Sequence, residues 1–320
     1  MKREAAYGKI RAVMLGHAVA DAVGVPAEFR SREELAKDPI TDMTGYGTYG
    51  MPAGTWSDDT SMSLAALDVL KDGECDLTAV MKNFIAWAYD EEYNARSVTF
   101  DIGMACLSAI SDYRFFKPTD PTAHGGRGES SNGNGSLMRI HPFALYIYYT
   151  KPDPVSEIEL IHKASALTHA HMRSKVACGI YSFILWELLK SPSKAAIKRG
   201  LDLARECYKG EKELENFTRL WGNLENLDES DIRSTGYVVD TIEAALWSVL
   251  TTNDYKSAVL RAVNLGEDTD TVAAIAGGIA AAFYGIENIP TEWLEGLARR
   301  EYIEEMCRIA ADNWTAKQRD

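Results

Sequence analysis

Two short clusters of carboxylates and hydroxyls are the features of this sequence most able to do chemistry. One is the Ser-Asp-Asp-Thr of residues 57–60, and the other is the Gly-Glu-Asp-Thr-Asp-Thr of residues 266–271. Each stands directly before an apolar run, and no Lys or Arg occurs between residues 37 and 71 or between residues 261 and 299. Buried carboxylates that lie close together repel one another and are costly to remove from water unless a cation balances them. Together the two clusters favour a metal site.

The chemistry of the clusters indicates which metal would bind. Carboxylate and hydroxyl oxygens, without clustered His or Cys, suit Mg²⁺ or Mn²⁺ better than zinc. Asp268 and Asp270 would diverge by roughly 200° on a regular helix, so they converge only if the helix begins between them. Asp58 and Asp59 would likewise diverge on a regular helix unless the helix begins between them. The alternative is that Asp58 and Asp268 are N-caps, the commoner role of Asp before an apolar run. Taken alone, either cluster would favour the N-cap role for its aspartate, whereas the two clusters together favour a metal site.

The apolar run that follows the second cluster is rich in small residues. We expect these residues to let their helix pack closely enough for the two clusters to meet, although they are far apart in the chain. The small residues are Ala273, Ala274, Ala276, Gly277 and Gly278.

A long irregular region, residues 117–135, ends in the Gly-rich stretch 132–136. Loops of this length inside a domain are usually functional or disordered. The stretch could present backbone amides to a phosphate, although Asn-Gly pairs are also plain turn signals. Among the histidines, His17 is expected to be a satisfied core residue. His169, just before a predicted helix, is as suited to a cleft as to the core.

Composition narrows the class of protein. The chain has 320 residues, 46% of them hydrophobic, and a net charge of −13, which argues against non-specific binding to nucleic acid or anionic membrane. No linker or change in composition divides it, so we expect a single domain, residues 1–320. The five cysteines are scattered and suit core positions. The N-terminus lacks the apolar core of a signal peptide, and the apolar stretches are predicted to fall short of a membrane span. A cytoplasmic location is expected.

The spacing of apolar residues is helical almost throughout, and no convincing strand pattern occurs. We therefore predict an all-α fold with a first helix ending near Gly24, followed by a loop over residues 28–52 that contains a short helix and lines a site. Further helices are predicted at about 59–71, 77–91, 101–115, 137–150, 154–167, 171–190, 193–207, 211–219, 236–251, 254–263, 270–284, 290–297 and 299–315.

Taken in order, five motifs of the chain resemble those of the ADP-ribosylglycohydrolase family, which includes the dinitrogenase-reductase-activating glycohydrolase and the animal ADP-ribosylhydrolases. The resemblance covers nearly the whole chain. The motifs are residues 16–29, 55–60, 132–139, 167–169 and 264–271.

The resemblance implies a compact all-α fold with two Mg²⁺ or Mn²⁺ ions at the floor of a cleft. One ion would be held by Ser57, Asp58 and Asp59, the other by Asp268 and Thr271, with Asp270 bridging the two.

Around the metals, the resemblance places Glu28 on a loop above the ions and Asp101 at the scissile bond, and leaves open which carboxylate is the acid or base. ADP-ribose would contact the Gly-rich loop, with His169 near the adenosine side. The residues implied in binding are Ser131, Asn132, Gly133, Asn134, Gly135, Ser136 and His169.

The implied function is a di-metal-dependent hydrolase that removes ADP-ribose from a modified target, with ADP-ribosyl-arginine on a protein as the leading substrate. Alternatives are a serine-O-linked, nucleic-acid-linked or small ADP-ribose derivative, a di-metal phosphatase, and a non-catalytic relative such as the lens crystallins of this fold. The four aspartates at 58, 59, 268 and 270 argue against the last. The expected partner is the ADP-ribosylated substrate, with no membrane and with nucleic acid only as a modified substrate, and the chain is expected to be a monomer.

Overall fold

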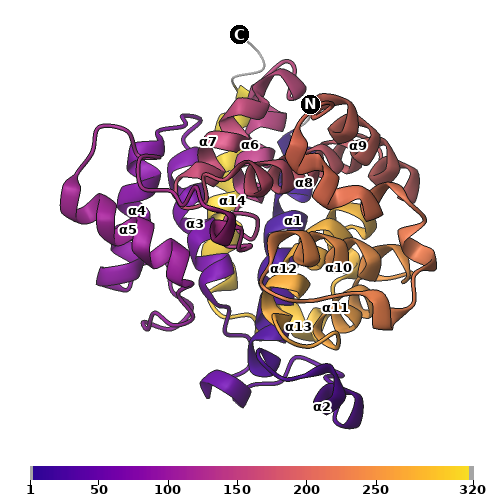
Figure 1. Cartoon of the computed structure of the whole chain (residues 1–320). Helices are drawn as coiled ribbons and strands as arrows, with labels where there is room; N and C mark the ends of the chain where they lie inside the picture. Colours follow the sequence, from indigo (N-terminus) through magenta and orange to yellow (C-terminus); the bar gives the residue numbers. More distant parts are fainter. Residues whose placement is uncertain (1–2, 317–320) are drawn as a thin grey trace.

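Two helices from opposite ends of the chain, α1 (Arg3–Gly24) and α12 (Thr269–Tyr284), pack side by side at the centre of the protein (Figure 1). Both are apolar on nearly every face, and almost all of α1 from residue 12 onward is buried. Such helices need cover from all sides. In the view of Figure 1, α3 to α5 lie on one side of this pair, and α9 to α11 lie on the other.

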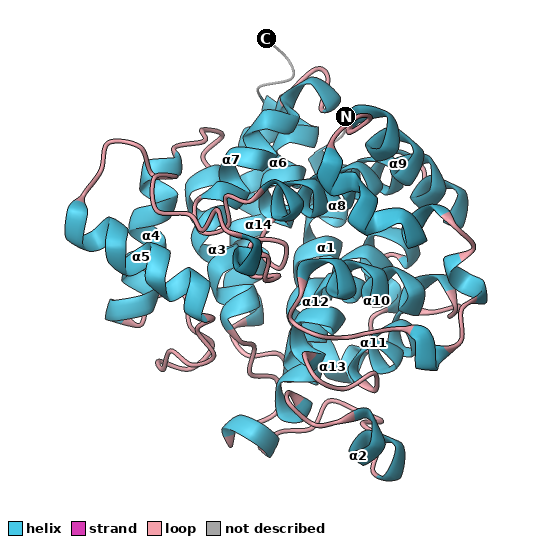
Figure 2. Cartoon of the chain, in the orientation of Figure 1, coloured by secondary structure: helices cyan, strands magenta, loops and turns pink. Residues whose placement is uncertain are grey.

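The computed structural model describes residues 3–316, so residues 1–2 and 317–320 of the expected single domain lie outside the described residues. Within that range the chain forms helices and loops without a strand, which confirms the all-α prediction (Figure 2). The remaining α-helices are α2 (Arg32–Lys37), α3 (Asp58–Leu70), α4 (Leu77–Asp90), α5 (Met104–Phe116), α6 (His141–Thr150), α7 (Ile158–Ala166), α8 (Met172–Lys190), α9 (Lys194–Cys207), α10 (Val238–Leu250), α11 (Tyr255–Val263), α13 (Thr291–Gly296) and α14 (Arg300–Ala316).

Four predicted helices differ from those observed. The helix predicted from 154 begins at Ile158, after the 3-10 helix η4 (Val155–Glu157). The helix predicted from 101 begins at Met104, because Asp101 adopts the left-handed backbone (φ 58°) and interrupts it. The helix predicted from 137 begins at His141, with a proline in its first turn. The segment predicted as a helix at 211–219 is the 3-10 helix η5 (Lys212–Trp221). The other predicted helices lie within a few residues of those observed.

The small residues of α12 pack against α1. A Cβ added to Gly277 would lie 2.3 Å from the Cβ of Ala20, and one added to Gly24 would lie 2.3 Å from the Cα of Asp270. The hydroxyl of Thr269 also donates to the Gly24 carbonyl at 2.8 Å. The close packing expected of this helix is present, and α1 is the partner that sets the position of the second acidic cluster.

We expect Gly24→Ala to destabilise the protein by about 1–3 kcal/mol, the usual penalty for overpacking a filled core. The backbone of Gly24 is right-handed (φ −77°) and suits alanine, so the loss would be purely steric. Gly8→Ala in the same helix is the matched control, because its new Cβ would meet no atom within 4 Å. Thermal unfolding followed by circular dichroism measures both variants. Equal melting temperatures for the two would refute the packing argument.

One segment has the length and composition of a membrane span. Arg3–Ala27 has a mean hydropathy of 1.2, so our prediction that every apolar stretch falls short of a span is wrong by this criterion. In the structure, 94% of its apolar window is buried by other parts of the protein, and a buried core helix meets the same criterion. Packing of α1 against α12 and α14 accounts for its hydrophobicity.

Candidate functional site

Folding brings the two acidic clusters together. The first turns of α3 and α12 lie side by side, and the hydroxyl of Thr271 donates to Oδ1 of Asp59 at 3.3 Å across 212 residues of sequence. Asp59 and Asp270 are almost fully buried, and Asp268 is half-buried. Within the described residues, none of these carboxylates forms an ion pair with Lys or Arg.

The local geometry argues against the capping alternative. The N-cap of α3 is Ser57, whose Oγ accepts from the Asp59 amide at 3.3 Å, so Asp58 and Asp59 both lie in the first turn rather than on either side of the helix start. Helix α12 does begin between Asp268 and Asp270, as convergence required. Asp268 occupies the N-cap position, but its side chain does not cap the helix. Its Oδ2 instead accepts from Nδ2 of Asn134 at 2.9 Å.

Asp21, a buried residue of α1, is a functional candidate that the sequence analysis did not assign. Its carboxylate accepts from the Ser57 amide at 2.9 Å, from the Thr60 amide at 3.1 Å and from the Thr60 hydroxyl at 2.6 Å. Burial raises the pKa of Asp21 to about 7, and these hydrogen bonds oppose the shift. Asp21 therefore fixes the first turn of α3 and the two aspartates on it. In the sequence, the feature that could have indicated this role is an aspartate at a core position of an apolar helix.

Glu28 and Asp101 approach the same cluster from two other segments. Glu28 follows the 3-10 helix η1 (Val25–Ala27), and one carboxylate oxygen each of Glu28, Asp101 and Asp270 lie within 4.8 Å of one another, a group that could hold a metal ion. The hydroxyl of Tyr49 donates to Oδ1 of Asp101 at 2.7 Å. Burial, followed by the charge of Asp101, raises the pKa of Glu28 to about 9.

The carboxylates of the cluster are held in an unfavourable electrostatic state. Burial first, and then the negative charge of neighbouring carboxylates, raises the pKa of Asp58, Asp59 and Asp270 well above the usual range. Oδ2 of Asp59, Oδ2 of Asp270 and Oε2 of Glu28 are buried without a hydrogen-bond partner in the described chain. Buried polar atoms are normally satisfied, and oxygen donors suit hard divalent cations. The residues therefore fit such a cation.

A cavity of about 490 Å³ opens above these acids. Of the residues predicted to act at the site, nine line it: Glu28, Asp58, Asp101, Gly133, Asn134, Gly135, His169, Asp268 and Thr271. Four others, Ser57, Asp59, Asp270 and Ser136, are almost fully buried and do not line it. The remaining two, Ser131 and Asn132, also lie outside its lining.

Hydrogen bonds from other segments hold the Gly-rich loop (residues 132–136) on both sides of residues 133–135, which face the cavity. The Asn134 amide donates to the Gly236 carbonyl at 3.0 Å, and its side chain reaches Asp268 and the Thr241 hydroxyl. Oδ1 of Asn132 accepts from Ser174 at 3.1 Å. Oγ of Ser136 accepts from Ser165 at 2.9 Å. Residues 133–135 face the cavity, and these contacts fix their position relative to the acidic cluster.

The two histidines differ in the outcome of their predictions. His169 lines the cavity and is otherwise buried, so it combines the two environments that the sequence left open. His17 is buried in the core as expected, with its ring centroid 4.2 Å from that of His141. No hydrogen bond of normal geometry reaches either ring nitrogen of His17, and the backbone of Ala274 and of Asp59 offers it weaker contacts, so the prediction of a satisfied residue is met only in part. Burial lowers the pKa of His17 to about 3, so the ring stays neutral.

An exposed aromatic side chain stands at the mouth of the cavity. Phe29 is 70% exposed and adopts the left-handed backbone (φ 66°), and its amide donates to the Glu267 carbonyl at 2.7 Å. Its ring centroid lies 6.5 Å from that of Tyr49, which lies 4.9 Å from that of Phe100. A large apolar ring held out in solvent beside an acidic cavity suits contact with a ligand.

Comparison with known proteins assigns the family. The model of the ADP-ribosylglycohydrolase family matches residues 2–319. The chain belongs to the ADP-ribosylglycohydrolase family. ADP-ribosylarginine hydrolase Tri1 of Serratia proteamaculans (strain 568) is 32% identical over 311 residues, which cover 93% of this chain and 78% of that relative.

Other matches agree. The ADP-ribosyl-dinitrogen reductase glycohydrolase of Rhodospirillum rubrum is 29% identical over 294 residues, which cover 88% of each chain. The solved structure of an ADP-ribosylglycohydrolase-related protein complex matches with a TM-score of 0.81 at 29% identity, covering 97% of this chain and 99% of that one. The chain is therefore a glycohydrolase, and its relatives act on ADP-ribosylated substrates.

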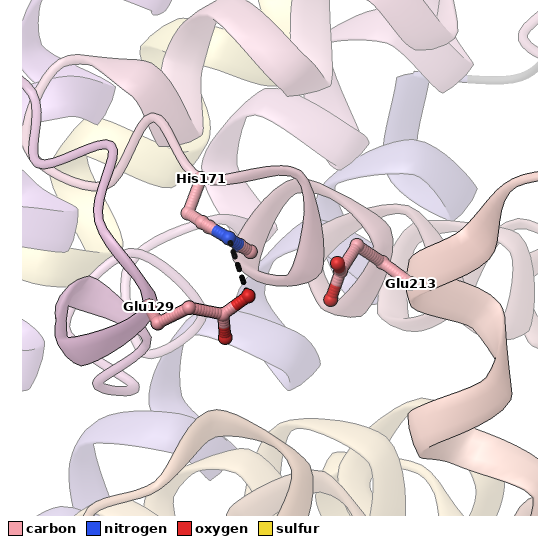
Figure 3. Close-up of side chains that lie close together, drawn as sticks. All are labelled: Glu129, His171 and Glu213. Atoms are coloured by element: carbon pink, nitrogen blue, oxygen red, sulfur yellow. Dashed lines mark ion pairs between the residues drawn. The ribbon is translucent and has the colours of Figure 1, made fainter.

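This ADP-ribosylglycohydrolase has a second group of possible metal ligands outside the cavity, formed by Glu129, His171 and Glu213 (Figure 3). Nε2 of His171 lies 3.7 Å from Oε1 of Glu129. Arg173 already pairs with both carboxylates, with Glu213 at 2.8 Å and Glu129 at 3.0 Å. A guanidinium that pairs with both acids already supplies hydrogen bonds and one positive charge to the group, which reduces the need for a cation. We therefore interpret the group as an ion-pair network that joins the irregular region to α8 and η5.

Proposed function

We propose that this glycohydrolase removes ADP-ribose from arginine side chains of proteins in a reaction that depends on two Mg²⁺ or Mn²⁺ ions. The observation that carries the proposal is the pair of buried, unpartnered carboxylate oxygens of Asp59 and Asp270 below the cavity. Without a cation, these carboxyl groups must either take up protons or bear the cost of buried charge.

In this proposal each acidic cluster contributes ligands. Ser57, Asp58 and Asp59 would hold one ion, Asp268 and Thr271 would hold the other, and Asp270 would contribute to both. When bound, the ions supply positive charge that orients the hydroxyls of the ribose at the scissile bond and polarises oxygen. The location of all six residues in or directly beside the first turns of α3 and α12 supports this ligand set.

Glu28 and Asp101 are the carboxyl groups at the cavity that the proposed ligand set does not use. Cleavage of a glycosidic bond passes through a state with oxocarbenium character, which a nearby carboxylate can stabilise or serve as acid or base. Tyr49 holds Asp101 through its hydroxyl. A carboxylate oxygen of Glu28 lies within 4.8 Å of those of Asp101 and Asp270. We assign acid–base work to this pair of residues.

Two observations support arginine as the leaving group. A relative with 32% identity over 93% of this chain is named ADP-ribosylarginine hydrolase. Phe29, 70% exposed at the cavity, offers a flat ring on which a guanidinium can stack. The acidic lining of the cavity favours a cationic leaving group over a neutral one.

The test of this function is a panel of peptides and nucleotides that carry ADP-ribose on arginine, on serine or on thymidine, incubated with Mg²⁺ or Mn²⁺. Released ADP-ribose and inorganic phosphate are both measured. We expect release from arginine at least about tenfold faster than from the other linkages, the discrimination that roughly 1.4 kcal/mol of differential transition-state binding provides. Faster release from serine or thymidine would contradict the assigned linkage. Release of phosphate without release of ADP-ribose would contradict cleavage of the glycosidic bond.

A further inference from the structure

Arg139, a fully buried residue beside the cavity, has no role in the function proposed above. It follows the Gly-rich loop, and within residues 3–316 it forms no ion pair with a carboxylate. Its guanidinium donates to the Ala164 carbonyl at 3.1 Å and to the Thr168 hydroxyl at 2.8 Å, and lies 4.8 Å from the ring centroid of Phe84. An arginine buried without a counter-ion is costly. Its contacts therefore call for a functional explanation.

The contacts of Arg139 lead to the cavity through Thr168. Oγ1 of Thr168 lies 2.8 Å from Nδ1 of His169, so guanidinium, hydroxyl and imidazole form one chain. A guanidinium can only donate, so Thr168 accepts from Arg139. The proton of the Thr168 hydroxyl then needs an acceptor. Nδ1 of His169, at 2.8 Å, is the stronger acceptor within its reach, and the Cys106 thiol, which also lies beside Thr168, is a weak one.

The direction of this chain determines which nitrogen of His169 carries the proton. If Thr168 donates to Nδ1, the neutral ring must carry its proton on Nε2. Nε2 lies 3.5 Å from the positions that a Cβ would take at Gly133 and at Gly135, and no hydrogen bond of the described residues uses it. His169 also lines the cavity. The Nε2–H group is thus free to donate to a ligand beside the Gly-rich loop.

We propose that Arg139 and Thr168 are positioning residues that hold His169 in its Nε2–H form, so that it donates a hydrogen bond to an oxygen of the bound ligand. We take this oxygen to be a phosphate or hydroxyl oxygen of ADP-ribose, and this identification of the ligand rests on the proposed function. The absence of side chains at Gly133 and Gly135 leaves room for that oxygen next to the imidazole.

The charge of Arg139 gives the arrangement a second consequence. Burial first, and then the nearby guanidinium, lowers the pKa of His169 to about 3. The imidazole is therefore neutral throughout the physiological range. A neutral ring whose Nδ1 is engaged by Thr168 offers a single donor of fixed direction, whereas a free histidine would exchange between two forms.

The test uses Thr168→Val, which removes the hydroxyl and keeps the branched shape, with Thr168→Ser as the matched control. NMR of protein labelled with ¹⁵N in histidine reads the form of His169 without ligand. In the wild type and in Thr168→Ser we expect Nε2–H from about pH 5.5 to pH 8.5, well above the lowered pKa. In Thr168→Val we expect a mixture of both forms.

Binding is measured on the same proteins by calorimetry with ADP-ribose. We expect Thr168→Val to weaken binding about tenfold, the usual worth of one well-placed hydrogen bond, and to raise KM with little change in kcat. Thr168→Ser should bind within about twofold of the wild type.

Two results would overturn the inference. The first is an Nδ1–H ring in the wild type, which needs no variant to fold. The second is a Thr168→Val protein with unchanged ring form and unchanged affinity. Failure of the wild type to bind ADP-ribose would instead refute the proposed function, because the form of His169 is read in the free protein.

Discussion

Replacing Asp270 with asparagine is expected to abolish ADP-ribose release while the protein remains folded. Asp270 is buried, its Oδ2 has no partner in the described chain, and it is the residue we assign to both ions. Loss of the charge would remove the bridge between them. Because bound ions contribute several kcal/mol to catalysis, the rate should fall on the order of 10³-fold or more. The rate of ADP-ribose release from ADP-ribosyl-arginine is the measurement that checks this expectation.

The same substitution should stabilise the metal-free protein. Asparagine has nearly the same shape, but it removes one charge from a buried cluster in which neighbouring carboxylates raise the pKa of Asp270. In chelator at pH 8 we expect the melting temperature to rise by roughly a few degrees. Asp202→Asn, an exposed site on α9, is the control and should change neither activity nor melting. An Asp270→Asn enzyme as active as the wild type would refute the metal assignment.

The second large effect concerns pH and metal together. In chelator, the melting temperature of the wild type should fall as pH rises from about 5 to about 9. The folded-state pKa of Asp21 is raised to about 7 and that of Glu28 to about 9. A raised carboxyl pKa means that the folded protein binds protons more tightly than the unfolded one. The resulting stability is full below the unfolded pKa and is lost as pH rises through the folded pKa.

Divalent cations should reverse this loss, because they replace the protons that balance the charge. At a metal concentration of about 100 times Kd, binding to the folded state alone contributes about 2.7 kcal/mol. For a chain of 320 residues the melting temperature should then rise by roughly 4 °C, with the largest rise at high pH. Differential scanning fluorimetry with Mg²⁺, Mn²⁺ or chelator across this pH range provides the measurement. Identical melting curves in metal and chelator at every pH would contradict the account.

Much of the candidate site could be anticipated because its signal is local. Acids followed by an apolar run, without basic neighbours, identify a buried negative cluster whatever the tertiary fold. The start of α12 between Asp268 and Asp270 follows from the same reasoning. The expectation for α3 missed by one residue, because Ser57 competes with Asp58 for the cap position and takes it.

The residues that support the site were not accessible to the same reasoning. Asp21 acts through amides 36 and 39 residues away, and Tyr49 through a carboxylate 52 residues away. No local pattern encodes such pairs. The role of Arg139 depends on a hydroxyl and an imidazole that only the packed structure brings into line. The prediction for His17 was met only in part because apolar spacing indicates burial but says nothing about hydrogen-bond partners.

The most direct test of the central claim is a titration of the metal-free protein with Mn²⁺, followed by electron paramagnetic resonance. If the clusters from residues 57–60 and 266–271 form one site, two Mn²⁺ ions will bind per chain and give the spectrum of a spin-coupled pair. Asp270→Asn will bind fewer ions or give uncoupled spectra. Binding of no Mn²⁺, or of a single isolated ion to the wild type, would contradict the claim that these carboxylates form a two-metal site.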